Sequence, residues 1–215
     1  MILKSFGCSF IFGTDLHDDG RNLRVPTASN HTWPALIAKK RSWDYRCHAR
    51  GGAGNTQILE RVLTHAALNE PAFFVIGWTW IDRFDYTHGE RDFWATVMPV
   101  DTDEKSRIYY RDLHSQFRDK FTSLCAIKTA IDALKQHNLP FLMTYMDDLL
   151  FETEWHTTPA IAYLQNYIRP YVTNFNGVNF VEWSRSQGFE ISSTMHPLEP
   201  AHAAAAELMN AQVKL

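Results

Sequence analysis

Three short turns carry residue types that suit nucleophilic catalysis. Ser9 stands in the sequence GCSF, directly after the apolar segment that opens the chain. A glycine-rich loop, RGGAGN, spans residues 50–55, and His196 begins the sequence HPLEPAH near the C-terminus. A serine hydroxyl needs a base within hydrogen-bond distance, histidine has a suitable pKa, and glycine loops let backbone N–H groups stabilise an oxyanion. Each turn alone is more typical of a cap, a loop or a surface histidine, but their order and placement together indicate a serine nucleophile assisted by histidine.

The elements that must position these turns alternate between strand-like and helix-like periodicity, which indicates βαβ units and a mostly parallel sheet. The apolar pattern predicts strands over residues 2–8, 44–49, 73–77, 139–145 and 178–181. It predicts helices over residues 33–38, 55–66, 112–137, 161–168 and 203–209. Each of the three turns follows a predicted strand. Because ligands bind beyond the carboxyl ends of the strands in such a sheet, we expect the turns to meet at one edge.

Two connections are too long and irregular to be simple loops. Residues 80–111 are rich in aromatic and charged side chains, which predicts an inserted lid or cap, and residues 147–158 form a second insertion. No repeat, low-complexity segment or change of composition divides the chain. We therefore expect one domain over residues 1–215.

The composition indicates a folded α/β protein rather than a disordered or fibrous one, with 45% apolar and 21% charged residues. A formal net charge of −3 gives no electrostatic reason to expect a nucleic-acid or membrane partner. There is no apolar run of spanning length and no secretory signal pattern at the N-terminus. Three cysteines without close pairing favour a reducing compartment. These features predict a cytoplasmic protein.

With these motifs the chain resembles the SGNH, or GDSL-like, hydrolase family, whose named residues Ser, Gly, Asn and His stand in separate blocks. GCSF at residues 7–10 is similar to the nucleophile block, Gly52 to the second block and His196-Pro197 to the last. The variant GCSF, a Trp-Pro helix and the ending HP-x4-H are most similar to SGNH-type proteins of bacteriophages. The resemblance covers nearly the whole chain apart from the two insertions. It implies a three-layer α/β/α sandwich with a mostly parallel, flavodoxin-like sheet.

The resemblance also implies roles for individual residues. Ser9 would be the nucleophile and His196 the general base, with the N–H groups of Ser9 and Gly52 in the oxyanion hole. The implied reaction is hydrolysis of small acyl esters, of which O-acetyl groups on carbohydrate are one class. It requires neither a cofactor nor a metal.

Two departures from the family pattern affect this interpretation. After the third predicted strand, the family's Gly-x-Asn-Asp is replaced by Gly-Trp-Thr-Trp at residues 77–80, so the asparagine donor is missing. The Thr79 hydroxyl or the Asn55 amide could substitute for it. Three residues before His196, the family's aspartate is replaced by Ser193. A Ser-His dyad is then the simplest prediction, with Asp147, Asp148 and Glu190 as possible replacements.

Other residues have a functional and a structural interpretation. Cys8 could be a thiol nucleophile, but strand alternation favours a buried thiol. His202 could share a metal with the aspartates at 147 and 148, but a helix-face or capping role fits its spacing better. Trp78 and Trp80 could bind a sugar, together with Phe84, Tyr86 and Phe93, or these aromatics could form a small core that anchors the insertion.

Three functions are compatible with this pattern. The first is a serine esterase. The second is a degenerate SGNH domain that serves as a glycan-binding or virion structural module, since the family's Asn and Asp are missing. The third is transfer of an acyl group to an acceptor other than water, with the same serine.

Overall fold

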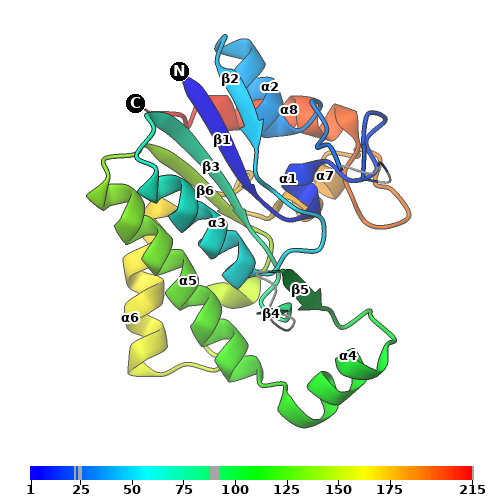
Figure 1. Cartoon of the computed structure of the whole chain (residues 1–215), viewed down its shortest axis with the longest axis vertical. Helices are drawn as coiled ribbons and strands as arrows, with labels where there is room; N and C mark the ends of the chain where they lie inside the picture. Colours follow the sequence, from blue (N-terminus) through cyan, green and yellow to red (C-terminus); the bar gives the residue numbers. More distant parts are fainter. Residues whose placement is uncertain (22, 24–25, 88–92, 215) are drawn as a thin grey trace.

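A parallel four-stranded sheet forms the centre of the protein (Figure 1). The computed structural model describes residues 1–21, 23, 26–87 and 93–214. The strand order is β2–β1–β3–β6, and every pair is parallel. The strands are β1 (Ile2–Gly7), β2 (Asp44–Cys47), β3 (Ala72–Trp78) and β6 (Phe141–Tyr145). All seven residues of β3 are buried, as a continuous apolar run predicts for a central parallel strand.

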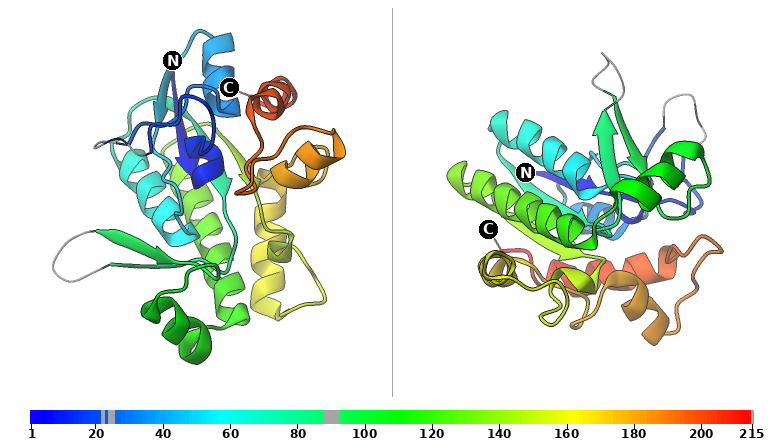
Figure 2. Two further views of the ribbon diagram at one scale, coloured as in Figure 1. Left: turned by 90° about the vertical axis from the view of Figure 1, so that its right-hand side faces the viewer. Right: turned by 90° about the horizontal axis from the view of Figure 1, so that it is seen from below.

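Helices cover both faces of the sheet, which gives the expected three-layer α/β/α sandwich (Figure 2). Phe73 and Val75 of β3 face one core, and Phe74 and Ile76 face the other, because successive side chains of a strand point to opposite sides. The first core is closed by α2 (Trp33–Lys40), α7 (Phe180–Ser186) and α8 (Glu199–Asn210). The second is closed by α3 (Asn55–Ala67), α5 (Gln116–Gln136) and α6 (Pro159–Ile168). Among the described residues, no helix has the length and apolarity needed to cross a bilayer.

The predicted strand over residues 178–181 is wrong. The side chain of Asn179 accepts a hydrogen bond from the Glu182 N–H at 3.0 Å and starts α7. Phe180, Val181 and Trp183 then lie buried at helical spacing. An asparagine cap and a helical spacing of apolar residues outweigh the short β-like run, because they satisfy the backbone and the core at once. The other predicted strands are present, with ends that differ by one or two residues.

The first insertion contains a hairpin and a short helical segment. Strands β4 (Phe84–Thr87) and β5 (Trp94–Val97) pair antiparallel, and α4 (Glu104–Ile108) follows. Residues 88–92 of the predicted insertion lie outside the described residues. The aromatic rings of Phe84 and Tyr109 stack with centroids 4.4 Å apart. Tyr109 is buried beneath this contact, but Phe84 and Phe93 are exposed, so these two rings do not form a closed core.

Asp85 of β4 fastens this insertion to the glycine-rich loop. Its Oδ1 accepts hydrogen bonds from the Gly54 N–H at 3.0 Å and the Thr96 hydroxyl at 2.6 Å, and its Oδ2 accepts one from the Gln57 N–H at 2.8 Å. A Cβ at Gly54 would lie 2.6 to 2.7 Å from the carboxylate atoms. The glycine at this position is therefore required by the close approach of Asp85, which also caps the start of α3.

We predict that Asp85→Ala lowers the free energy of unfolding by about 2–4 kcal/mol, since it leaves buried donors without acceptors. Urea unfolding followed by circular dichroism measures the change. Asp112→Ala is the matched control, because Asp112 is exposed and pairs with its neighbour Arg111. Equal stability of the two variants would contradict the role given to Asp85.

Candidate active site

Two glycines allow the turn that carries Ser9 to sit directly on the end of the sheet. The short helix α1 (Ser9–Phe12) begins two residues after β1 ends. Gly7 and Gly77 are paired in neighbouring strands. A Cβ at Gly7 would lie 2.6 Å from Ile11 Cγ1, and a Cβ at Gly77 would lie 2.7 Å from the same atom. The missing side chains let Ile11 pack against both strands and thereby fix the position of Ser9.

Ser9 and His196 meet, although 187 positions separate them. The Nε2 of His196 lies 2.8 Å from the Oγ of Ser9. The backbone around His196 is fixed by its own turn, since its carbonyl accepts from the Ser192 N–H at 2.8 Å and its N–H donates to the Ser192 hydroxyl at 3.1 Å. The ring of Phe10 packs on the imidazole with centroids 4.8 Å apart. This geometry is that of a serine hydroxyl beside a positioned base.

The acid that orients His196 is Asp15. Its Oδ2 lies 3.0 Å from His196 Nδ1, so Ser9, His196 and Asp15 form a continuous hydrogen-bonded chain. The simple dyad, Ser193 at the family's aspartate position and the three replacements considered from sequence do not match this arrangement. The replacements lie elsewhere. Ser193 and Glu190 are exposed. Asp147 accepts from the N–H groups of Ile81 and Leu149, and Asp148 accepts from Asn179.

Hydroxyl and guanidinium donors surround the Asp15 carboxylate. Ser192 donates to its Oδ2 at 2.6 Å, Thr194 donates to the same oxygen, and Arg21 donates to its Oδ1 at 2.6 Å. Burial raises the pKa of Asp15, but these hydrogen bonds outweigh burial and hold the pKa well below its usual range. Asp15 has a φ of 71°, a left-handed conformation that aspartate adopts more readily than most residues. The carboxylate is therefore ionised at neutral pH.

Of the residues expected to bind an oxyanion, Gly52 lies at the cavity, whereas Asn55 and Thr79 do not. Gly52, with a φ of 78°, lines the same cavity as Ser9. The amide of Asn55 is buried and donates to the Thr79 carbonyl at 3.2 Å and the Ser123 hydroxyl at 3.0 Å, while its oxygen accepts from the Thr79 N–H at 2.9 Å. Thr79 is fully buried and does not line the cavity. The structure thus brings Gly52 to the site and uses Asn55 and Thr79 to join α3 to the end of β3.

Ser9, His196 and Gly52 lie in a cavity of about 650 Å³. Trp80 lines it and packs on Phe10 with ring centroids 5.4 Å apart. Trp78 is fully buried in the core on the α3–α5 side of the sheet, so its expected contact with substrate is wrong. Strand alternation would put both tryptophans on one side of the sheet, but β3 ends at Trp78, and Trp80 lies beyond the strand end, where the chain turns toward the cavity.

The buried His202 has a structural role. Its Nδ1 accepts a hydrogen bond from the Trp33 N–H at 3.1 Å, at the start of α2. Burial lowers the pKa of His202 to about 3, which keeps the ring neutral and able to accept. The side chain caps a helix, as its sequence position favoured over a metal role.

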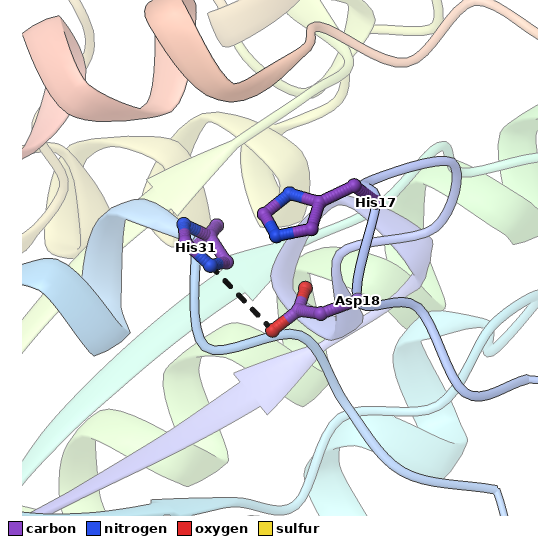
Figure 3. A group of neighbouring side chains, drawn as sticks. All are labelled: His17, Asp18 and His31. Carbon is purple, nitrogen blue, oxygen red and sulfur yellow. Dashed lines mark ion pairs between the residues drawn. The ribbon is translucent and has the colours of Figure 1, made fainter.

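One group of side chains has the composition of a metal site. His17, Asp18 and His31 each offer a ligand atom, and these atoms lie within 4.8 Å of one another (Figure 3). All three side chains already have contacts within the protein. His17 Nδ1 lies 2.9 Å from Glu199 Oε1, and Asp18 accepts from the Asn30 N–H at 2.9 Å. The first contact joins the loop that carries Asp15 to the start of α8, and the second joins it to the segment before α2.

Asp15 is the site residue that sequence reasoning missed. It lies six positions after Ser9, in the sequence GTD at residues 13–15. An acid so close to the nucleophile in sequence, just after a glycine that ends a short helix, was the available signal. The family pattern instead indicates an aspartate three residues before His196, near the other end of the chain.

Comparison with known proteins places the fold. No family model and no curated protein matches the sequence. Among solved structures, a lipolytic protein of the G-D-S-L family from Desulfitobacterium hafniense superposes with a TM-score of 0.51 at 10% identity, covering 98% of each chain. The esterase EstA from Pseudoalteromonas gives a TM-score of 0.55 at 10% identity, covering 97% of this chain and 93% of that one. The acetyl xylan esterase Est2A from Butyrivibrio proteoclasticus gives 0.53 at 13% identity, covering 98% of this chain and 63% of that one.

At these identities the comparisons establish the fold. The chain has the α/β/α fold of G-D-S-L lipolytic proteins and esterases, as the sequence motifs implied. It spans about two thirds of the length of the acetyl xylan esterase.

The environment of His196 makes a prediction about its pKa. Burial lowers the pKa of His196 below 6.5, and the hydrogen bond and charge of Asp15 raise it in part. Asp15→Asn removes the negative charge and leaves at most a weaker hydrogen bond between neutral groups, so the pKa should fall further. Histidine NMR signals followed against pH measure the midpoint. Asp148→Asn is the control and should leave it unchanged; an upward shift in Asp15→Asn would contradict the proposed contact.

Proposed function

We propose that the protein is a serine esterase that hydrolyses small acyl esters. One observation carries the proposal: Ser9, His196 and Asp15 form a hydrogen-bonded chain that opens into a cavity of about 650 Å³. A nucleophile, a base and an orienting acid in this order are the requirements of acyl transfer. The fold shared with G-D-S-L lipolytic proteins and esterases agrees with this function.

In the proposed reaction, the Ser9 Oγ attacks the ester carbonyl while His196 Nε2 accepts its proton. The resulting tetrahedral intermediate collapses when His196 returns that proton to the leaving alcohol, which leaves an acyl group on Ser9. Water then attacks the acyl-enzyme with His196 again as the base, and the acid is released. Asp15 holds the imidazole with Nδ1–H toward its carboxylate and stabilises the imidazolium that forms twice in the cycle.

The negative charge on the intermediate requires donors at the cavity. We assign this role to the backbone N–H groups of Ser9 and Gly52. The first turn of α1 has no intrahelical acceptor for its N–H groups, and Gly52 approaches the cavity without a side chain. Asn55 and Thr79 contribute by holding α3 and the glycine-rich loop in place. The site therefore works with backbone donors where related families add an asparagine side chain.

The substrates we propose are esters with a short acyl group, such as O-acetyl groups on carbohydrate. Trp80 offers an aromatic surface beside Ser9 on which a sugar ring can stack. Acetyl xylan esterase Est2A, with the same fold, acts on an acetylated glycan by its name. From the sequence alone, we also propose that the protein is an SGNH protein of the bacteriophage type and that it is cytoplasmic, in the host cytoplasm if a phage encodes it.

Reaction with a fluorophosphonate probe tests the nucleophile. The wild-type protein should be labelled and should hydrolyse p-nitrophenyl acetate, while Ser9→Ala should lose both, because only a serine activated by a base reacts. Ser193→Ala is the matched control and should keep both, since Ser193 is exposed and lies outside the hydrogen-bonded chain. A wild-type protein that is not labelled would support the binding-module alternative. Labelling without net hydrolysis would favour acyl transfer to another acceptor.

The length of the acyl group tests the substrate proposal. We predict that kcat/KM for p-nitrophenyl esters falls from acetate to octanoate, and that the protein releases acetate from acetylated glycans. Preference for the octanoate ester would contradict the deacetylase function and leave a general esterase. Ser9→Ala provides the baseline for spontaneous hydrolysis.

A further inference from the structure

The cavity that holds Ser9 is rich in positive charge. Three arginines line it: Arg21, Arg50 and Arg83. No aspartate or glutamate is found among the described residues that line the cavity. Arg21 is neutralised, because its guanidinium lies 2.6 Å from Asp15 and 3.0 Å from Asp19. The other two arginines carry the unbalanced charge.

Arg50 and Arg83 are each held by one backbone carbonyl. Arg50 Nη1 donates to the Trp94 carbonyl at 2.9 Å, and Arg83 Nη1 donates to the Ala53 carbonyl at 3.1 Å. Within the described part of the chain, neither has a carboxylate at ion-pair distance, and their Nε and Nη2 groups have no protein acceptor. Both guanidinium groups are therefore fixed in position with donors to spare.

The acids that flank Arg83 in sequence are used elsewhere. Asp85 accepts its three hydrogen bonds from Gly54, Gln57 and Thr96. Asp82 lines a second cavity, of about 210 Å³, on the side of Asp147. The charge of Arg83 acts on both acids only through space, and it lowers their pKa values less than burial raises them. Neither acid neutralises the Ser9 cavity.

Aromatic rings further define where the two arginines lie. The Arg83 guanidinium lies over Trp80, 5.0 Å from the ring centroid, and that of Arg50 lies 6.0 Å from the centroid of Phe93. Trp80 and Arg83 both line the cavity, so a ring surface and a cationic fork stand side by side there. A planar guanidinium matches the two oxygens of a carboxylate and binds them with paired hydrogen bonds.

Two arginine side chains without paired carboxylates give this partly enclosed cavity a positive potential, which attracts anions. From these contacts we infer that the cavity takes esters that carry a carboxylate group, which Arg50 and Arg83 bind while the ester lies at Ser9. This inference rests on the proposed esterase function and narrows its substrate class. Acylated acidic sugars carry the carboxylate on the alcohol part, and half-esters of dicarboxylic acids carry it on the acyl part.

Paired substrates test the inference. For the alcohol part, 4-acetoxybenzoate is compared with its methyl ester; for the acyl part, mono-p-nitrophenyl glutarate is compared with p-nitrophenyl methyl glutarate. In at least one pair, the wild-type kcat/KM should be about tenfold or more higher for the anion, as expected for a hydrogen bond between charged groups. The pair that shows the preference identifies the part of the substrate that the arginines bind.

Variants assign the preference to the two arginines. Arg50→Gln and Arg83→Gln should each reduce the ratio of anionic to neutral kcat/KM toward one, and the lysine variants should keep part of it. Arg111→Gln removes the same charge from an exposed site and should leave the ratio unchanged. A wild-type ratio near one in both pairs would overturn the inference. So would an equal loss for both members of a pair, because the arginines would then assist the reaction or the loop rather than bind an anion.

A binding measurement separates this inference from the proposed function. Ser9→Ala lacks the proposed nucleophile and should leave the esters intact, so calorimetry can compare its affinity for 4-acetoxybenzoate and for the methyl ester. Tighter binding of the anion, lost in Ser9→Ala combined with Arg83→Gln, supports the carboxylate site even if the wild-type protein hydrolyses none of the esters. Equal affinity for the two compounds would contradict it even if hydrolysis is observed.

Discussion

The contact between Asp15 and His196 joins the first and last parts of the chain, and the arrangement at Ser9 depends on it. The loop that carries Asp15 follows β1 and α1, whereas His196 precedes α8. These two segments are held together because α2 and α8 pack side by side on the same face of the sheet (Figure 1). From the first turn of α8, His202 caps the start of α2 and Glu199 binds His17. Packing of two helices thus fixes a hydrogen bond between residues 181 positions apart.

The balance of electrostatic effects at this contact favours a neutral base beside a charged acid. Desolvation disfavours the ionised form of each group, so it raises the pKa of Asp15 and lowers that of His196. For Asp15, the hydrogen bonds of four donors lower the pKa more than burial raises it, so the carboxylate stays ionised. For His196, burial lowers the pKa more than the single carboxylate of Asp15 raises it, so the imidazole stays neutral near pH 7. A neutral imidazole can accept the Ser9 proton, and an ionised Asp15 can stabilise the cation that results.

Much of this arrangement could be predicted from the sequence, for reasons that differ between its parts. The parallel sheet follows from fully apolar segments such as β3, and the positions of Ser9 and Gly52 follow from the ends of β1 and β2, which share one edge. His196 follows no strand, because residues 180–186 form α7, and its placement depends on the packing of α8 against α2. Asp15 could not be predicted in this way, because its role depends on a left-handed turn and on hydroxyls that arrive from residues 192 and 194. The burial of Trp78 and the engagement of Asn55 depend on how α3 and α5 pack against β3, which a linear pattern does not contain.

The hairpin β4–β5 connects the arginines of the cavity to the glycine-rich loop that carries Gly52, the proposed oxyanion donor. Asp85 holds the Gly54 and Gln57 N–H groups, Arg83 holds the Ala53 carbonyl, and Arg50 reaches back to the Trp94 carbonyl. The glycine-rich loop is therefore cross-linked to the hairpin by acidic and basic side chains, on both sides of Gly52. An insertion attached in this way is part of the site's framework rather than a separate lid. Arg50 and Arg83 both hold the glycine-rich loop and line the cavity. An anion bound by them would therefore also stabilise the position of Gly52. The charge of the substrate and the geometry of the proposed oxyanion donor would then be linked through one loop.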